Sequence, residues 1–411
     1  MQSVLLPARI ILRNRGFVVV LVCNLLLGLA YSFVVPFMSM FGTIEAKMTP
    51  LRFSVFMVTT SLAAIVISTV LARWSDTHLS RRSMLILGSI CGALGYVGYA
   101  FVRDAVWLTV IGSTVLALSS ITFSQLFAHA RELLVESKIP TQETPLYNNV
   151  FRLFFALAWT FGPAIASWIM LMYSYPGMFL GAAGLFILLL ITVIGFIPES
   201  PPSETRRQAI RVSLRRTLVR RDLLAYFVGF VLINVCSTIG MMNLPLMVLN
   251  TLGGTPRDVG IVYSVGPVFE IPLMLYFGVL ASKGDQTRVI RLGTLIAVVY
   301  YSLLLLVRAP WQVFPLQILS AAMVAVNSGV AITFFQNYVP DQPGTATNLF
   351  ITAARIGSTT GYLLFGGLAT ALDHRTVFGI CATLSAVTLL LFLHQQRQTR
   401  RDVLAAAAKF I

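Results

Sequence analysis

Charged residues are scarce in this chain, and acidic residues are the scarcest of them. Only 11% of its 411 residues are charged, with 15 aspartates and glutamates against 30 lysines and arginines. A soluble domain usually has about a quarter of its residues charged. Because so few charges cannot cover a surface that faces water, the composition excludes an ordinary soluble protein.

The sequence also lacks the usual signs of an enzyme or a metalloprotein. The four cysteines lie in apolar segments and have neither metal-binding nor redox spacing. There is no Walker-type phosphate loop, and no group of His, Asp and Glu that would form a catalytic site. We therefore expect a protein that is not an enzyme and holds no metal or cofactor. The lack of a ring of charges disfavours a channel.

Apolar sequence is abundant instead, since 57% of the residues are hydrophobic. A helix needs roughly 20 residues to cross the hydrocarbon core of a bilayer, and the apolar runs have that length. The sequence predicts an all-α membrane protein with twelve transmembrane helices in two six-helix halves. We expect these helices at 17–41, 51–73, 83–102, 107–135, 145–172, 177–197, 222–249, 257–281, 287–307, 311–338, 344–371 and 377–394.

The basic residues gather on one side of this arrangement. The formal net charge of +15 at first suggests a nucleic-acid partner. However, most of the 30 lysines and arginines lie at the termini, in the central linker and in the connections on the same side. The positive-inside rule then places both termini in the cytoplasm. The lipid bilayer is therefore the expected partner, with no nucleic acid.

The two halves repeat one another. Gln125 ends the sequence Ile-Thr-Phe-Ser-Gln, and Gln336 ends Ile-Thr-Phe-Phe-Gln, each near the end of the fourth segment of its half. Duplicated blocks of six helices are typical of secondary transporters. We divide the chain into an N-terminal half (1–197), a basic cytoplasmic linker (198–221), a C-terminal half (222–394) and a cytoplasmic tail (395–411). The linker is either an amphipathic helix on an anionic leaflet or a solvated connector.

Each half also has a polar hairpin after its second segment and an arginine inside its fifth. A carboxylate in such a hairpin can accept from the amides of a neighbouring helix start and pair with an arginine. We interpret these residues as a latch or gate at the cytoplasmic side, against the simpler reading of ordinary loop charges. The predicted gating residues are Asp76, Arg81, Arg82, Arg152, Asp285 and Arg355.

Glu270 is the acidic residue nearest the middle of a predicted helix. A carboxylate inside the membrane is costly, so it should face a cavity or a partner. Glu270 is thus a candidate for proton coupling and for substrate binding, and the sequence does not choose between these two roles. The alternative is a structural role beside Pro267 and Pro272.

The 2–3 hairpin, with Asp76 before Arg81 and Arg82, resembles the signature loop of the major facilitator superfamily. Ala72 stands where that signature usually has glycine, and the Asp-to-Arg spacing is one residue longer. Within the superfamily the chain is most similar to the bacterial sugar efflux transporters. The similar stretches are 75–82, 125–132, 157–163, 270–272 and 335–347.

This resemblance implies the major facilitator fold, alternating access and export of sugars such as lactose, glucose or thiogalactosides. It also implies exchange for protons and a place in the bacterial inner membrane. We further expect a monomer. The alternative is an exporter of drugs or other small solutes from the same superfamily.

Sugars are bound by amides, which both donate and accept, and by aromatic faces. In a duplicated transporter the substrate site lies between the halves near the middle of the membrane. The alternative for any one amide is a hydrogen bond between helices. The predicted substrate-binding residues, besides Glu270, are Gln125, Gln336, Asn24, Tyr31, Asn234, Asn243, Trp159 and Asn327.

Overall fold

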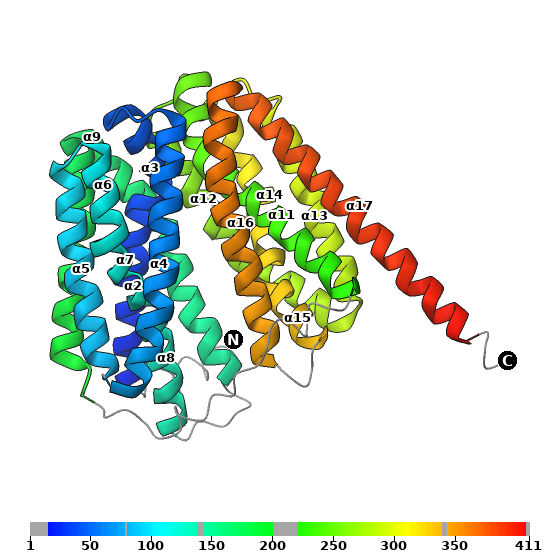
Figure 1. Ribbon diagram of the computed structural model, residues 1–411, viewed down its shortest axis with the longest axis horizontal. Coiled ribbons are helices and arrows are strands. Elements are labelled where there is room, and N and C mark those ends of the chain that lie inside the picture. Colours follow the sequence, from blue (N-terminus) through cyan, green and yellow to red (C-terminus); the bar gives the residue numbers. More distant parts are fainter. Residues whose placement is uncertain (1–14, 79, 138–143, 200–220, 339–342, 408–411) are drawn as a thin grey trace, which may run out of the picture. The chain divides into compact units, whose positions relative to one another are not determined.

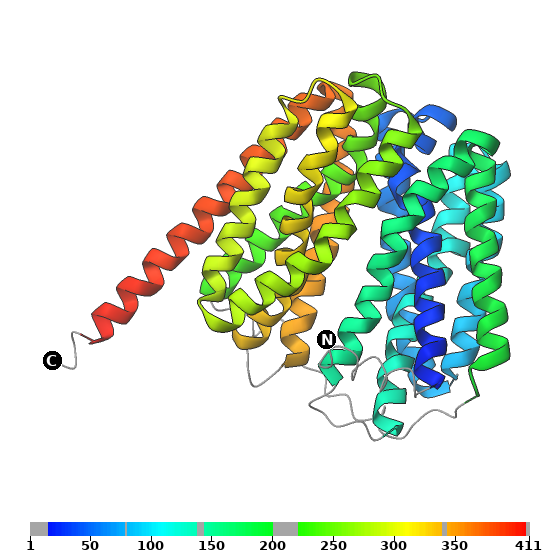
Figure 2. The ribbon, with the colours of Figure 1, turned by 180° about the vertical axis from the view of Figure 1, so that it is seen from behind.

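The computed structural model describes residues 15–78, 80–137, 144–199, 221–338 and 343–407. Within these ranges the chain is helical and contains no β-strand. Figure 1 shows the helices in sequence colours, and Figure 2 shows them from behind. The predicted linker lies almost wholly outside the described residues.

The first repeat begins with α2, which continues through three short turns to residue 45. Its fourth segment is also interrupted by a π turn, and α9 is one long helix bent at Ser174. The elements are α2 (Arg15–Val34), η1 (Val35–Phe37), α3 (Met38–Met40), η2 (Phe41–Glu45), α4 (Pro50–His78), α5 (Arg81–Phe101), α6 (Ala105–Ile111), η3 (Gly112–Leu116), α7 (Ala117–Ser119), α8 (Ile121–Glu136) and α9 (Thr144–Phe196).

The second repeat has the same order of long helices and π turns. Its elements are α11 (Arg221–Leu246), η5 (Met247–Thr251), α12 (Pro256–Lys283), α13 (Gln286–Leu304), η6 (Pro310–Gln312), α14 (Val313–Ala325), η7 (Val326–Val330), α15 (Ala331–Tyr338), α16 (Pro343–Ala371) and α17 (His374–Ala407).

The described residues contain ten segments that are long and apolar enough to cross a membrane. One of them, Val150–Phe196, is two helices, because Ser174 has φ 55° and ψ −164° inside α9. The less apolar α16, with 29 residues, is the remaining long helix. These described helices fit the twelve that the sequence predicts.

Two helices run further than expected. Because no glycine or proline interrupts 73–78, α4 continues to His78, and Asp76 lies in its last turn. The expectation that Asp76 follows the end of this helix was therefore wrong. The red helix of Figure 1, α17, continues to Ala407 rather than ending near 394.

The chain divides into two compact units. Unit 1 comprises 1–48, 56–209 and 259–267, and unit 2 comprises 49–55, 210–258 and 268–411. The start of α4 thus belongs to unit 2, where Ser54 Oγ donates to the Tyr362 carbonyl at 2.5 Å. The start of α12 belongs to unit 1, where Ser264 Oγ accepts from the Ala164 amide at 3.1 Å.

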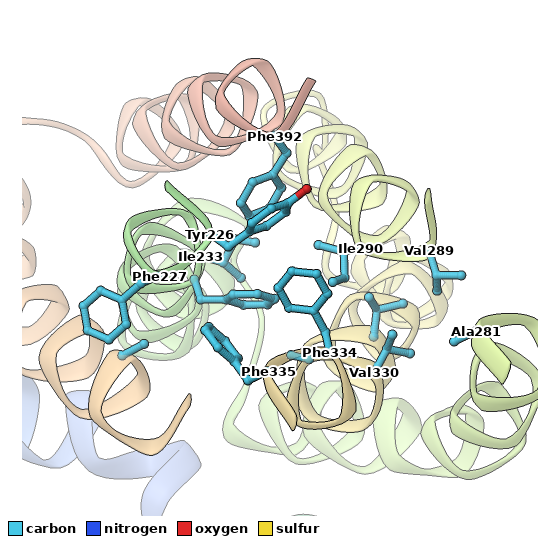
Figure 3. Close-up of a cluster of buried hydrophobic side chains, with 14 of the residues drawn as sticks. Tyr226, Phe227, Ile233, Ala281, Val289, Ile290, Val330, Phe334, Phe335 and Phe392 are labelled. Atoms are coloured by element: carbon cyan, nitrogen blue, oxygen red, sulfur yellow. The ribbon is translucent and has the colours of Figure 1, made fainter. Parts of the chain in front are cut away.

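Apolar side chains form the core of each unit. In unit 1, α2 packs along α9, as Figure 2 shows for the dark blue helix and its teal and green neighbours. In unit 2, aromatic rings from α11, α15 and α17 meet around Phe334, which lies 4.6 Å from Tyr226 between ring centroids (Figure 3). Burial of such large apolar side chains gives each unit its own packed interior.

The repeat extends to individual side-chain contacts. The rings of Tyr96 and Phe179 stack with centroids 6.3 Å apart and planes inclined by 17°. In the second repeat, Tyr301 and Phe378 stack at 6.2 Å and 18°. The duplication recognised in the sequence is therefore also a duplication of packing.

The π turns η2 and η5 are equivalent as well. After η2, the Ala46 amide donates to Phe41 O at 2.8 Å and the Met48 amide to Gly42 O at 2.9 Å. After η5, the amides of residues 252 and 254 donate in the same way to the carbonyls of residues 247 and 248, at 3.0 and 2.8 Å. The first and seventh long helices thus end in the same closed turn.

Candidate functional site

Arg81 links two helices of the first repeat. It lies at the start of α5, directly after Ser80, whose side chain accepts from the Ser83 amide and so caps the helix. The guanidinium reaches α8, where Nη1 donates to Gln125 Oε1 at 2.7 Å and Nη2 lies 3.2 Å from Glu132 Oε1. Because the two α8 residues are seven apart, they share one helix face and hold the same arginine.

This network brings a predicted gating residue and a predicted sugar ligand together. Gln125 is 2% exposed and the Arg81 side chain 12% exposed, so their bond is shielded from solvent. Sequence reasoning did not select Glu132. Its place seven residues after Gln125, on the same face of the helix, was the signal that could have found it.

Gln336 is bonded differently from its counterpart. Its Nε2 donates to Thr347 Oγ1 at 3.0 Å, which joins α15 to α16. Both glutamines therefore connect the fourth helix of a repeat to another helix, but through different partners. Their shared role as sugar ligands remains a prediction.

Asp285 and Arg82 each contact the end of a helix. Asp285 caps α13, because Oδ1 accepts from the Thr287 amide at 2.9 Å, and Arg288 Nε lies 3.7 Å from Oδ2. Arg82 Nη2 donates to the Ile194 carbonyl in the last turn of α9 at 2.8 Å. The Asp76 side chain lies outside the described residues.

The two arginines predicted inside helices are both exposed in the structure. Arg152 lies in α9 and Arg355 in α16, which are the corresponding fifth helices of the two repeats. Because both side chains are exposed, other parts of the protein or solvent can reach their guanidinium groups. Their gating role stays a prediction.

Three of the predicted amide ligands join helices or bond to their own backbone. Asn24 is fully buried and donates to the Phe151 carbonyl at 2.6 Å. Asn243 is also fully buried and bonds to His374 in α17. Asn234 donates to its own helix, at the carbonyl of Phe230, 2.8 Å away. In this conformation, the burial of Asn24 and Asn243 fits a structural bond better than contact with a sugar.

Trp159 and Asn327 differ from those amides. Both are partly exposed, and among the described residues neither Trp159 Nε1 nor Asn327 Oδ1 has a hydrogen-bond partner. Asn327 lies in the π turn η7 and lines a small cavity with Thr294 and Met323. Such turns inside α-helices occur often at functional sites. Tyr31 is partly buried, with its ring edge-on to Phe186 at 6.2 Å.

Glu270 lies near the middle of α12 and is half-buried. Gly266 stands one turn earlier on the same helix face, and a Cβ built there would meet nothing within 4 Å. The face that carries Glu270 therefore borders open space. Because a carboxylate in contact with lipid is costly, we expect a polar cavity or a partner beside Glu270, and its role stays a prediction.

The chain matches the sequence pattern of the Major Facilitator Superfamily over residues 20–359 and again over 227–409. It is 30% identical to a sugar efflux transporter homologue of Deinococcus radiodurans, over 92% of this chain and 97% of the other. It is 29% identical to sugar efflux transporter A of Dickeya chrysanthemi, over 89% and 92% of the two chains.

Solved structures show the same fold at lower identity. The crystal structure of the nucleoside transporter NupG matches with a TM-score of 0.78 and 14% identity, covering 93% of this chain and 99% of the other. The peptide transporter POT matches with a TM-score of 0.74 and 12% identity, covering 94% and 95%.

The fold and these matches define a multi-pass membrane transporter rather than an enzyme. The chain belongs to the major facilitator superfamily and, within it, to the sugar efflux transporter family.

Proposed function

We propose that the protein exports sugars or glycosides, such as lactose, glucose or thiogalactosides, in exchange for protons. Its relatives are named sugar efflux transporters, which supports the substrate class. The single observation that carries the proton coupling is Glu270, a half-buried carboxylate on a helix face that borders open space. Such a group can take up and release a proton as the cavity changes its access.

The proposed orientation places both termini in the cytoplasm, in the inner membrane, with the protein acting as a monomer. The positive-inside rule supports this orientation, because the α4–α5 and α12–α13 connections carry basic residues on the side of the termini. The turns η2 and η5 then face away from the cytoplasm.

In this proposal the polar hairpins act at the cytoplasmic gate. The bonds of Arg81 to Gln125 and Glu132 support it, because they fix the start of α5 against α8. Arg152 and Arg355 are both exposed, and we propose that they pair with the hairpin carboxylates when the halves move. Among the predicted ligands that are partly exposed, Trp159 and Asn327 each keep a polar atom with no hydrogen-bond partner in the described structure, which supports them as sugar ligands.

Efflux from proteoliposomes with an imposed pH gradient tests the proposal. The parent protein should export a labelled thiogalactoside faster when the gradient drives protons inward through it. Glu270→Gln, which keeps the shape but cannot carry a proton, should remove the dependence on the gradient. Efflux that ignores both the gradient and this substitution would rule out Glu270 as the coupling site.

Asp104→Asn is the matched control. Asp104 caps α6 by accepting from the amides of Val106 and Trp107, at 3.0 and 3.1 Å. Because asparagine caps helices as well as aspartate, this variant removes a carboxylate without loss of the cap. It should export with the parent's gradient dependence.

A binding experiment separates sugar export from the alternative function. If lipophilic cations compete for binding to the purified protein and glycosides do not, the protein is a drug exporter instead.

A further inference from the structure

One histidine fastens the start of α17 to the end of α11. His374 Nδ1 lies 2.8 Å from Asn243 Oδ1, and Asn243 Nδ2 donates to the His374 carbonyl at 2.8 Å. On its other side, His374 Nε2 lies 3.5 Å from Nδ2 of Asn250, which is exposed in the π turn η5. The imidazole therefore lies between two amides of the same long segment.

These bonds fix the tautomer of the imidazole. Asn243 is fully buried, and its amide nitrogen is committed to the His374 carbonyl, so its oxygen faces Nδ1. Because a carbonyl oxygen only accepts, Nδ1 must carry the hydrogen. Nε2 of the neutral ring then has a lone pair, which accepts from the Asn250 amide.

We propose that His374 is a pH-sensitive fastener for the η5 end of α11. When Nε2 takes up a proton, its new N–H faces the amide nitrogen of Asn250, which is also a donor, and that bond is lost. The added charge also lies in the first turn of α17, where the amide groups of the helix disfavour a cation. Protonation thus loosens η5 from α17, while the two bonds between His374 and Asn243 remain.

Among the charged and titratable groups near the start of α17, His374 is the one whose side-chain type has an ordinary pKa between about 5 and 8. The Asp373 carboxylate accepts from the Thr376 hydroxyl and from the Arg375 amide, 3.1 Å away. The Arg375 guanidinium donates to the Leu305 carbonyl at 3.3 Å. The elements packed against α17 are α11, α13, α16 and η5. The charged or titratable groups among their described side chains are Tyr226, Cys236, Arg288, Arg291, Tyr300, Tyr301, Arg355 and Tyr362, and α17 itself adds Cys381, His394 and Arg397. Apart from His394, which lies 20 residues further along α17, the ordinary pKa values of these side-chain types lie outside the range from about 5 to 8.

The first repeat has no such histidine at the equivalent turn. Tyr175 lies four residues before Phe179, as His374 lies four before Phe378, and its ring lies 5.8 Å from Phe41 of η2. The turn is held instead by Glu45 Oε1, which is 2.9 Å from Arg103 Nε. The ordinary pKa of a tyrosine side chain lies outside the range from about 5 to 8. Of the two equivalent turns, only the one at η5 is therefore held by a histidine.

The tautomer can be measured directly on the purified full chain. Nitrogen chemical shifts of ¹⁵N-labelled histidine should show His374 protonated at Nδ1 at pH 8, with a second proton arriving at Nε2 on acidification. The signal is assigned by its loss in His374→Asn. A neutral form protonated at Nε2 would overturn the proposal.

Hydrogen exchange tests the release of the turn. After correction for intrinsic rates, amides of 244–254 should exchange roughly fivefold faster at pH 5.5 than at pH 7.5, as expected for one lost hydrogen bond. Amides of 38–48, around η2, are the internal control and should not change. Equal change in both segments, or none in 244–254, would contradict the proposal.

His374→Asn keeps a donor near the Nδ1 position but cannot titrate, so exchange over 244–254 should become independent of pH. His394→Asn is the matched control, because His394 is an exposed histidine in the same helix that bonds Gln398. This control should keep the parent's pH dependence. A pH effect that survives in His374→Asn would assign it to another group.

Discussion

Lys47 and Gly253 occupy the same position in two copies of one turn. Lys47 has φ 51° and Gly253 φ 68°, and each follows a π turn closed by the same pair of backbone bonds. A residue with a Cβ is strained in this left-handed region by roughly 1–2 kcal/mol, whereas glycine is not. The second repeat has the residue that the turn favours, and the first does not.

Lys47→Gly should therefore stabilise the protein, by up to about 1 kcal/mol after the added freedom of the unfolded chain is subtracted. Gly253→Lys should destabilise it by a similar amount. Thermal unfolding in detergent measures both. Lys47→Ala keeps the Cβ and should give no gain; a gain equal to that of Lys47→Gly would assign the effect to the lost charge.

Ser174 should also be a site where glycine stabilises. Its φ of 55° and ψ of −164° belong to a region that essentially only glycine adopts, and such strain costs roughly 1–3 kcal/mol. The strain arises because the two arms of α9 are joined there without a loop. Ser174→Gly should raise the unfolding temperature and Ser174→Ala should not. A lower temperature for the glycine variant would show that the serine side chain matters.

The bonds of Arg81 predict that its two partners are not independent. Removing the arginine leaves Glu132 and the 2%-exposed Gln125 without their shared donor. Contacting residues usually couple by about 0.5–3 kcal/mol. Arg81→Gln and Glu132→Gln should each lower stability, and the double variant should lose less than the sum of the two losses. Arg82 contacts the Ile194 carbonyl and Glu199 instead, so the loss in Arg82→Gln should add to that in Glu132→Gln. Additive losses for Arg81 and Glu132 would contradict the network.

Gly366 and Gly367 should respond in opposite ways to alanine. A Cβ at Gly366 would lie 2.5 Å from the Cβ of Ser54 and 3.0 Å from the Pro50 carbonyl oxygen. A Cβ at Gly367 would meet nothing within 4 Å. Gly366→Ala should therefore lower the unfolding temperature, while Gly367→Ala should raise it slightly, since alanine favours a helix over glycine by about 1 kcal/mol. A rise in unfolding temperature for both variants would show that Ser54 moves aside without loss of stability.

Much of the fold could be predicted, because apolar run length sets a membrane helix. The expected spans agree with the observed helices over most of their length. The ends were less predictable. Residues 73–78 contain no glycine or proline, so α4 continues past Asp76 to His78. The bend at Ser174 lies within a helix that is otherwise continuous from residue 144 to residue 196. The π turns η2, η3, η5 and η7 leave no recognisable pattern in the residues.

The contacts of the candidate-site residues could not be predicted, because sequence spacing gives the face of a helix but not the helix that it meets. Gln125, a predicted sugar ligand, bonds Arg81, 44 residues away. Asn243, another predicted ligand, bonds His374, 131 residues away. Their roles as sugar ligands stay predictions. His374 itself was missed, since nothing around it in the sequence distinguishes it from a polar residue at a helix start.

The sequence by itself determined the class of this protein, its all-helical membrane architecture and its duplication. Those features follow from composition and from the length of apolar runs, which act locally. The tertiary structure decided which polar groups pair: Arg81 with Gln125 and Glu132, and His374 with Asn243 and Asn250. These contacts depend on the rotation and crossing of separate helices, which are set by the packing of many side chains together.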